Sequence, residues 1–483
     1  MNARRIALMA LTVVVPAVSI GAQGTLDRAK QPKAGKSPTL RVPGWSKVKL
    51  SNGADLIVVE KHDLPLVAVN IDFVGGTTTY EPKDKLGTGS FTAAMLSEGT
   101  TSKTADQLSD AQQMLGTSIG VQVGGESGTI RFTSLKDKVG PAMALLADML
   151  VNSTFPDSAL ERIRARTLVA LTQAKDQPNA IASNVFSKVV YGEDHPYGRV
   201  TNERTVKSIT RADVMAFHKA YFLPGRAVIT VSGDVDPKAV KPMIEKALAS
   251  WAKGGSRPAF NYPPPPASKA RTIYLVDKPK AAQSVFAFGT PGPTRYTPDY
   301  YSLSVMNHLL GGLFQSRLNH DIREVKGYSY GVRSSFAYGR GPGAFQAGGG
   351  IVSAKTDSAL IGFMKHFRGV QGAEPWTDDE VTQGKESLIQ SLPSRFSTVN
   401  AIAAAVGSLY TQDLPPTYFQ TYASKINGVS KADLTRVAKK FIDIDHLNLV
   451  IVGDRATIEG PLKATGIAPI QILDVEGKPV LVP

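Results

Sequence analysis

Two segments of this sequence repeat each other at a distance of nearly half the chain. T-R-A-D at residues 210–213 returns as S-K-A-D at residues 430–433, an offset of 220. At the same offset, V-S-G-D at residues 231–234 returns as I-V-G-D at residues 451–454. Each copy combines a helical pattern with an apolar strand that ends in a Gly-Asp turn. The chain is therefore expected to contain two copies of one structural unit.

Further matches occur earlier in each copy, with small changes of register that loop insertions would produce. At an offset of 219, three residues of the first copy match three of the second: Tyr191, Asp194 and Pro196 with Tyr410, Asp413 and Pro415. At an offset of 216, Tyr80 and Pro82 match Tyr296 and Pro298. Because these matches keep the same order in both copies, chance is a poor explanation for them.

A proline-rich stretch separates the two copies. Residues 253–269 contain four consecutive prolines, Pro263 to Pro266, and this composition favours a stiff extended connector. We therefore expect one domain at residues 43–252 and a second at residues 270–483. A chain of 483 residues also exceeds the roughly 250–300 residues at which a single core stops growing.

The pattern of apolar residues in the first copy indicates alternating strands and helices. Strands are expected at residues 54–60 and 66–74, a strand pair at 120–135, and helices at 89–96, 105–115, 141–150 and 158–175. This order predicts an α+β fold of two homologous domains, each a mixed or antiparallel sheet flanked by helices.

The N-terminus has the layout of a secretory signal peptide. Arg4 and Arg5 precede an apolar run, and small residues follow at Ser19, Gly21 and Ala22. We expect cleavage after Ala22, a loose leader at residues 23–42, and a periplasmic or secreted protein. A membrane anchor is the alternative, but the apolar run is shorter than the ~18 residues that a spanning helix needs. No integral membrane segment is expected after cleavage.

Composition excludes several kinds of site. The chain has no cysteine, so it has no disulfide, thiolate nucleophile or cysteine-ligated metal. Its net charge of +14 is spread along the chain without any nucleic-acid-binding motif, so we expect no nucleic-acid partner. Its seven histidines include no pair at metal-ligand spacing within a helix.

Several stretches, in order, resemble the pitrilysin and insulinase family of zinc metallopeptidases. They are L-G-T-G-S-F-T-A-A-M-L-S-E-G-T at residues 86–100, E-D-H-P-Y-G at 193–198, V-S-G-D-V-D-P at 231–237, G-G-L-F-Q-S-R-L at 311–318 and I-R-E-V-K-G-Y-S-Y at 322–330. The resemblance covers nearly all of the chain after the leader. It implies two α+β halves paired around an enclosed chamber of the metallopeptidase type.

The same resemblance points to a missing zinc site. Active members of the family carry an inverted zinc motif, H-x-x-E-H, whose three positions fall here on Ser90, Ala93 and Ala94. A further glutamate ligand would fall on Ala170, or on Val169 or Leu171 if the register differs by one residue. Because zinc needs imidazole, carboxylate or thiolate donors, we expect this chain to hold no metal cofactor.

The second half keeps a pair that the resemblance links to catalysis. Arg323 and Tyr330 match the arginine and tyrosine that the family's second domain presents to the substrate carbonyl and the developing oxyanion. Tyr328 and Arg333 are the alternatives if the register differs. An ordinary arginine in an amphipathic helix and an ordinary tyrosine in a strand would give the same local pattern.

The retained pair beside an erased zinc motif favours a non-catalytic subunit of a heterodimeric exported zinc peptidase. The partner, a homologous chain, would bring the zinc, and the substrate would be an unfolded peptide. Two alternatives remain open: a peptide-binding or scaffold protein on the same fold, and an independent hydrolase that uses Ser90. A homodimer is also open.

Overall fold

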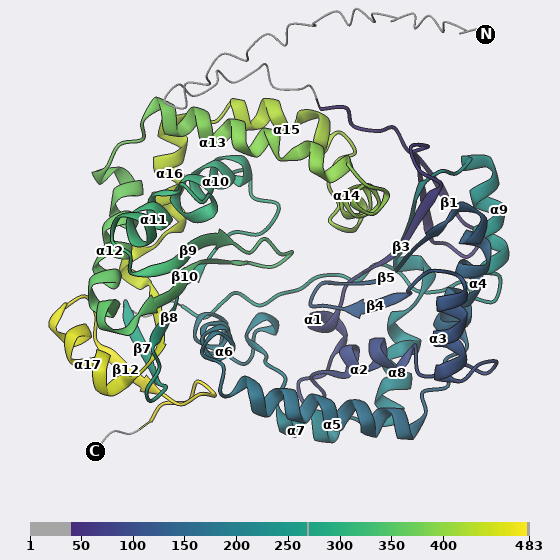
Figure 1. The fold of residues 1–483 in the computed structure, drawn as a ribbon, viewed down its shortest axis with the longest axis horizontal. Helices are drawn as coiled ribbons and strands as arrows, with labels where there is room; N and C mark the ends of the chain where they lie inside the picture. The colour runs from purple at the N-terminus through teal and green to yellow at the C-terminus, as the bar shows by residue number, and fades with distance from the viewer. Residues whose placement is uncertain (1–39, 268–269, 481–483) are drawn as a thin grey trace, which may run out of the picture. The chain divides into compact units, whose positions relative to one another are not determined.

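The computed structural model describes residues 40–267 and 270–480 (Figure 1). The predicted signal peptide and residues 23–39 of the predicted leader lie outside the described residues. Leu40–Pro483 forms one compact unit. Residues 252–267, which include the four prolines of the predicted connector, contain neither helix nor strand.

The first half contains a six-stranded mixed sheet. Its strand order is β1-β2-β6-β3-β5-β4, with β2 parallel to β6 and the other neighbours antiparallel. The strands are β1 (Ser46–Lys49), β2 (Asp55–Glu60), β3 (Leu66–Val74), β4 (Gly120–Val123), β5 (Ser127–Leu135) and β6 (Ala227–Gly233). The predicted strands of this half are present within a few residues of their expected ends.

The second half contains a sheet of the same size and a closely similar order. The order is β12-β7-β11-β8-β10-β9, with β11 parallel to β7 and antiparallel to β8. The strands are β7 (Thr272–Asp277), β8 (Gln283–Pro291), β9 (Ser329–Phe336), β10 (Ala344–Val352), β11 (Asn448–Gly453) and β12 (Ile470–Leu473). Two mixed sheets flanked by helices confirm the predicted α+β class.

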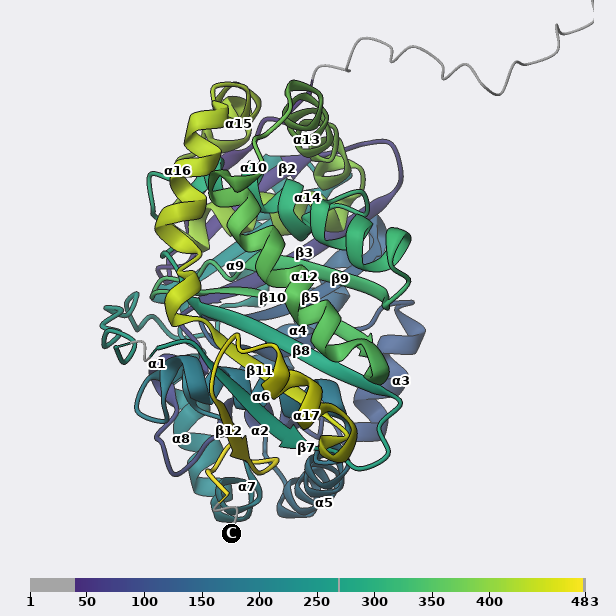
Figure 2. The same ribbon diagram turned by 90° about the vertical axis from the view of Figure 1, so that its left-hand side faces the viewer.

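Helices cover the sheets of both halves (Figures 1 and 2). The first half has α1 (Thr77–Tyr80), α2 (Thr88–Met95), α3 (Ala105–Met114), α4 (Val139–Val151), α5 (Asp157–Ala174), α6 (Pro178–Tyr191), α7 (Glu203–Ser208), α8 (Arg211–Tyr221) and α9 (Pro237–Ala247). The second half has α10 (Tyr300–Asn307), α11 (Arg317–Asn319), α12 (Thr356–Arg368), α13 (Asp378–Gln390), α14 (Val399–Thr411), α15 (Tyr418–Asn427), α16 (Lys431–Phe441) and α17 (Arg455–Ala464).

The repeated T-R-A-D and S-K-A-D segments have the same structural role. Thr210 and Ser430 are the N-caps of α8 and α16, and each exchanges hydrogen bonds with the aspartate three residues later, Asp213 or Asp433. Such a capping box satisfies N–H groups that the first helical turn leaves unpaired. The sequence repeat therefore marks equivalent helix starts in the two halves.

The two halves exchange one helix each. Helix α6 of the first half packs on β8 and β11 of the second sheet, while α14 of the second half packs on β3 and β6 of the first sheet. These helices end near Tyr191 and Tyr410, the pair matched at an offset of 219. Each sheet is thus covered on one face by helices of its own half and on the other by a helix of the opposite half.

Strand β3 shows why the first sheet has two different faces. Val67, Val69, Ile71 and Phe73 point into the core formed with the helices of their own half. The intervening residues Ala68, Asn70 and Asp72 point to the opposite face of the sheet, toward α14. Helix α14 therefore lies on a face made of small and polar side chains.

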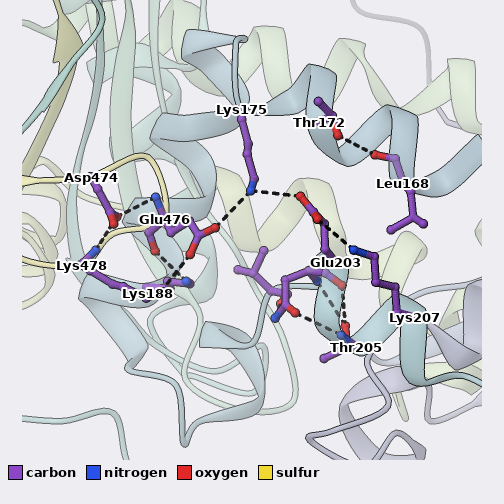
Figure 3. Close-up of polar contacts among 12 residues, drawn as sticks. Leu168, Thr172, Lys175, Lys188, Glu203, Thr205, Lys207, Asp474, Glu476 and Lys478 are labelled. Atoms are coloured by element: carbon purple, nitrogen blue, oxygen red, sulfur yellow. Dashed lines mark hydrogen bonds and ion pairs between the residues drawn. The ribbon is translucent and has the colours of Figure 1, made fainter.

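The segment after β12 returns to the first half (Figure 3). The Nζ of Lys175, the C-cap residue of α5, lies 3.2 Å from a carboxylate oxygen of Glu476 and 3.2 Å from one of Glu203. The Lys188 Nζ on α6 donates a hydrogen bond of 2.7 Å to the backbone oxygen of Glu476. Each exposed ion pair contributes little to the free energy of unfolding. These interactions therefore position the C-terminal segment more than they stabilise the fold.

In residues 40–267 and 270–480, none of the helices combines the length and the apolar character that crossing a bilayer requires.

Candidate functional site

Helix α2 carries the three positions that correspond to the zinc motif. The carboxylate of Glu81 fixes the start of this helix by accepting hydrogen bonds from the N–H groups of Gly87, at 3.2 Å, and Gly89, at 2.5 Å. Burial raises the pKa of Glu81, and these two hydrogen bonds oppose the rise. On the helix, Ser90 is exposed and Ala93 is only 5% exposed, whereas Ala94 is half-buried.

Helix α5 carries the position of the expected fourth zinc-site residue. Ala170 lies on this helix and is exposed, as is its neighbour Val169. Helix α2 packs against α5, α8 and strand β4 (Figure 1), so the two helices that would form a zinc site are in contact. Ser90, Ala93, Ala94 and Ala170 thus lie on two helices that pack together.

The side chains on these elements do not fit a zinc ion. Three of the four positions are alanines with no donor atom, and a single serine hydroxyl is not among the ligands that hold zinc in proteins. Within residues 40–267 and 270–480, no group of three or more histidine, aspartate or glutamate side chains is arranged to hold a metal ion. In that part of the chain, Ser90 makes no hydrogen bond to a histidine or a carboxylate.

Arg323 lies in a π-helical turn, His320–Val325, on the second half. Its side chain is 36% exposed, its Nε is 3.2 Å from a carboxylate oxygen of Glu324, and its guanidinium carbon lies 4.5 Å from the ring centroid of Phe314. Phe314 belongs to G-G-L-F-Q-S-R-L, one of the stretches that carry the family resemblance. The ring contact restricts the side chain while leaving part of the guanidinium group open to solvent.

Tyr330 lies on β9, an edge strand of the second sheet, and is 87% exposed. Further along β9, Val332 and Phe336 are buried, whereas Arg333 is exposed on the opposite face. Its side chain is therefore open to solvent over most of its surface. Among the described residues, no hydrogen bond or ring contact joins it to Arg323.

The two alternative residues have different surroundings. Tyr328 is half-buried and packs against the core of the second half, with Lys355 Nζ 5.7 Å from its ring centroid. Arg333 lines a cavity of about 220 Å³ beside α6, together with Asn179 and Ser183. Because Tyr328 is committed to packing, Tyr330 is the better candidate for contact with a substrate.

The structure adds a junction that the sequence did not reveal. The carboxylate of Glu126, in the turn between β4 and β5, accepts hydrogen bonds of 2.9 and 3.1 Å from the N–H of Arg340, in the turn between β9 and β10. Tyr197 donates a hydrogen bond to the same carboxylate, and its oxygen accepts one of 3.0 Å from Gly341. Only the pairing of two backbone turns creates this contact, so no side-chain pattern could have indicated it.

His195 packs beside this junction and contacts Tyr197. Its Nδ1 accepts a hydrogen bond of 3.0 Å from the N–H of Tyr197, and its ring stacks on Tyr191 and Tyr262. Burial lowers its pKa. The Nε2 of His308 lies 3.1 Å from the hydroxyl of Ser387, so this histidine has a hydrogen-bond partner within the protein.

Two family models match this sequence. Residues 57–198 match "Insulinase (Peptidase family M16)" and residues 208–388 match "Peptidase M16 inactive domain". Together the two matches cover more than half of the chain and include α2 in the first half and the Arg323 to Tyr330 segment in the second.

Relatives match over most of their own length. The "Uncharacterized zinc protease YmxG" of Bacillus subtilis is 24% identical over 388 residues, which are 80% of this chain and 92% of the relative. The "Non-peptidase homolog YmxG" of Helicobacter pylori is 23% identical over 405 residues, which are 83% and 92% of the two chains.

Solved structures share the fold. A peptidase M16 inactive domain from Pseudomonas fluorescens superposes with a TM-score of 0.78 and 25% identity, covering 85% of this chain and 98% of the other. A protease from Helicobacter pylori has a TM-score of 0.76 at 16% identity, covering 85% of this chain and all of the other. With the family matches to both halves, these similarities show that the chain belongs to the insulinase family, peptidase family M16, as a member without the residues of the family's zinc motif.

Proposed function

We propose that this chain is the zinc-lacking subunit of an exported, two-chain M16 peptidase. A homologous partner supplies the zinc ion and its H-x-x-E-H motif. This chain supplies Arg323 and Tyr330, which bind the substrate carbonyl and stabilise the oxyanion that forms on it. The observation that carries the proposal is the contrast between Tyr330, which is 87% exposed, and the zinc-motif positions, which hold no ligand.

The local structure suits Arg323 and Tyr330 to this role. Arg323 is held by Phe314 and Glu324 but keeps part of its guanidinium group exposed, so its N–H donors are preoriented. Tyr330 keeps its hydroxyl in solvent on an edge strand. A donor that is positioned before the substrate arrives, as Arg323 is, costs little reorganisation in the transition state.

Edge strands β4 and β9 support an unfolded peptide as the substrate. Each lies at the end of its sheet, pairing with β5 or β10 respectively. An edge strand presents unpaired N–H and C=O groups to which an extended peptide adds as a further strand. Strand β4 also contacts α2, so a peptide on β4 would pass the helix where active relatives hold zinc.

The names of the relatives are consistent with a family in which some members are peptidases and others are not. The Bacillus subtilis relative is named a zinc protease and the Helicobacter pylori relative a non-peptidase homolog. The proposed export to the periplasm or the cell exterior rests on the apolar segment and small residues at 1–22.

Coexpression with a zinc-bearing M16 chain from the same genome tests the proposal. The two chains should purify together, and the pair should cleave a fluorogenic unfolded peptide in a manner that a zinc chelator abolishes. The isolated chain should be inactive with or without added zinc. A pair that forms but cleaves no peptide would favour the scaffold function, and chelator-resistant cleavage by the isolated chain would favour a hydrolase based on Ser90.

A further inference from the structure

The second half contains a cavity of about 390 Å³ whose lining includes neither Arg323 nor Tyr330. It lies among the segment that leads into α10, the 3₁₀ turn Leu392–Phe396, α14 and the start of α15. Its polar lining comes from Arg295, Tyr300, Arg395, Ser408, Gln412 and Tyr418. We call it the arginine pocket. Its volume is within the range of sites that bind small ligands.

Arg295 is fixed in the arginine pocket by aromatic rings. Its guanidinium carbon lies 3.7 Å from the ring centroid of Tyr300 and 5.3 Å from that of Tyr418, and its backbone N–H donates a hydrogen bond of 2.8 Å to Gly339. Stacking holds the flat face of the guanidinium group and leaves its N–H edge free for a ligand. By contrast, Arg340 nearby is neutralised by Asp413 at 2.8 Å.

The arginine pocket is positively charged. In the described part of the chain, neither Arg295 nor Arg395 has a carboxylate within ion-pair distance, and no acidic residue lines the pocket. Burial raises the pKa values of Tyr418 and Tyr422, that of Tyr422 to about 12, so both hydroxyls stay neutral. The charges of Arg395 and Arg295, which line the same pocket, oppose the rise for Tyr422.

The remaining lining residues are apolar. They are Ala401, Ala404, Ala405, Leu414 and Phe419. Two unpaired arginines beside an apolar wall fit an anion that carries an apolar group. The Ser408 hydroxyl donates to the backbone oxygen of Ala405 at 2.7 Å and can still accept a hydrogen bond, and the exposed Gln412 amide can both donate and accept, so the pocket also suits a peptide bond.

We infer that the arginine pocket binds the free C-terminal end of a peptide, with Arg295 and Arg395 holding the α-carboxylate and the apolar wall holding the last side chain. The planar guanidinium group of arginine binds a carboxylate through two parallel hydrogen bonds. This site is separate from the proposed contribution to catalysis, and its test does not depend on a zinc-bearing partner.

Isothermal titration calorimetry on the full chain, with N-acetyl-Ala-Phe as the free acid and as the amide, tests the inference. The acid should bind saturably and the amide at least about tenfold more weakly. Arg395→Gln, at an exposed side chain, should weaken binding of the acid by about tenfold or more, and Arg295→Lys should also weaken it because lysine lacks the planar fork. Arg368→Gln, at an exposed arginine on α12, is the matched control and should bind like the wild type.

Equal binding of acid and amide would overturn the inference, as would unchanged affinity in Arg395→Gln with the fold retained by circular dichroism. Inorganic phosphate that binds as tightly as the acid would also overturn it, because the apolar wall would then contribute nothing.

Discussion

Gly407 of α14 lies directly against Asp72 of β3, across the contact between the two halves. A methyl group at Gly407 would lie 2.8 Å from Oδ2 of Asp72 and 3.0 Å from the hydroxyl of Thr230. The close approach brings a helix of the second half onto the polar face of the first sheet. It also buries the Asp72 carboxyl group. This one contact therefore affects both the packing of α14 on the sheet and the pKa of Asp72.

Gly407→Ala should destabilise the protein by about 1–3 kcal/mol, because the added methyl group overpacks the contact between α14 and the first sheet. In an ordinary helix position the same change stabilises by roughly 0.5–1 kcal/mol. Gly460→Ala on α17 is the control, since a methyl group there meets nothing within 4 Å. Urea unfolding of the two variants should give changes of opposite sign. A stabilised Gly407→Ala variant would contradict the contact.

Asp72 should make stability depend on pH. Burial raises its pKa to about 6 from an ordinary 3.8, against the hydrogen bond from Thr129 at 2.6 Å and the charge of Arg131. The pKa of Asp72 is higher in the folded state than in the unfolded state. Protonation of Asp72 therefore contributes fully to the free energy of unfolding below about pH 4, and this contribution is lost as pH rises through about 6. From about pH 4.5 to 7.5, the wild type should therefore lose about 2 kcal/mol of unfolding free energy relative to Asp72→Asn.

Urea titrations at both pH values measure this difference. Asp110→Asn, at an exposed carboxylate on α3, should follow the wild type. If Asp72→Asn also follows the wild type over this range, Asp72 does not titrate as the structure requires.

Removal of the Glu126 carboxylate should lower the free energy of unfolding, because this group joins the two hairpin turns. Glu126→Ala leaves the N–H of Arg340 and the hydroxyl of Tyr197 without their acceptor, which should destabilise the protein by about 1–3 kcal/mol. Glu126→Gln keeps one acceptor oxygen and should cost less. Glu386→Ala, at an exposed glutamate on α13, is the comparison and should stay within about 0.5 kcal/mol of the wild type by thermal unfolding. Equal effects of the three changes would argue against the junction.

Much of the fold followed from the sequence because its signals are local. The start of α8 at Thr210 and of α16 at Ser430 could be predicted from capping residues, and β3 could be predicted from its apolar run. The exchange of α6 and α14 could not, since their apolar faces do not specify which sheet they cover. The contact of Gly407 with Asp72 depends on that exchange.

The candidate site was predictable to a lesser degree. The resemblance located Ser90, Ala93, Ala94 and Ala170, and the structure places them on two helices that touch. It also located Arg323, but the π-helical turn around that residue has no local sequence signal. The arginine pocket could not be predicted, because Arg295 and Arg395 lie far apart in the sequence. The fold brings them to one cavity together with residues of α14 and α15.

Restoring two histidines should create measurable zinc affinity at α2. Ser90→His with Ala94→His places two imidazoles one helical turn apart, and the wild-type residues there are exposed and half-buried, so the rings have room. Zinc should raise the thermal midpoint of this double variant more than that of the wild type or of Ser90→His alone. Equal shifts in all three proteins would show that the helix does not present the two positions to a common ion.

The central claim is that half of a split active site survives in this chain. In the purified pair with a zinc-bearing partner, Arg323→Ala and Tyr330→Phe should each lower kcat by about a hundredfold or more while the pair stays assembled and keeps its zinc. Arg368→Ala, at an exposed arginine on α12, serves as the matched control and should leave kcat unchanged. If both Arg323→Ala and Tyr330→Phe cleave the peptide at the wild-type rate, the chain contributes no catalytic donors and the claim is wrong.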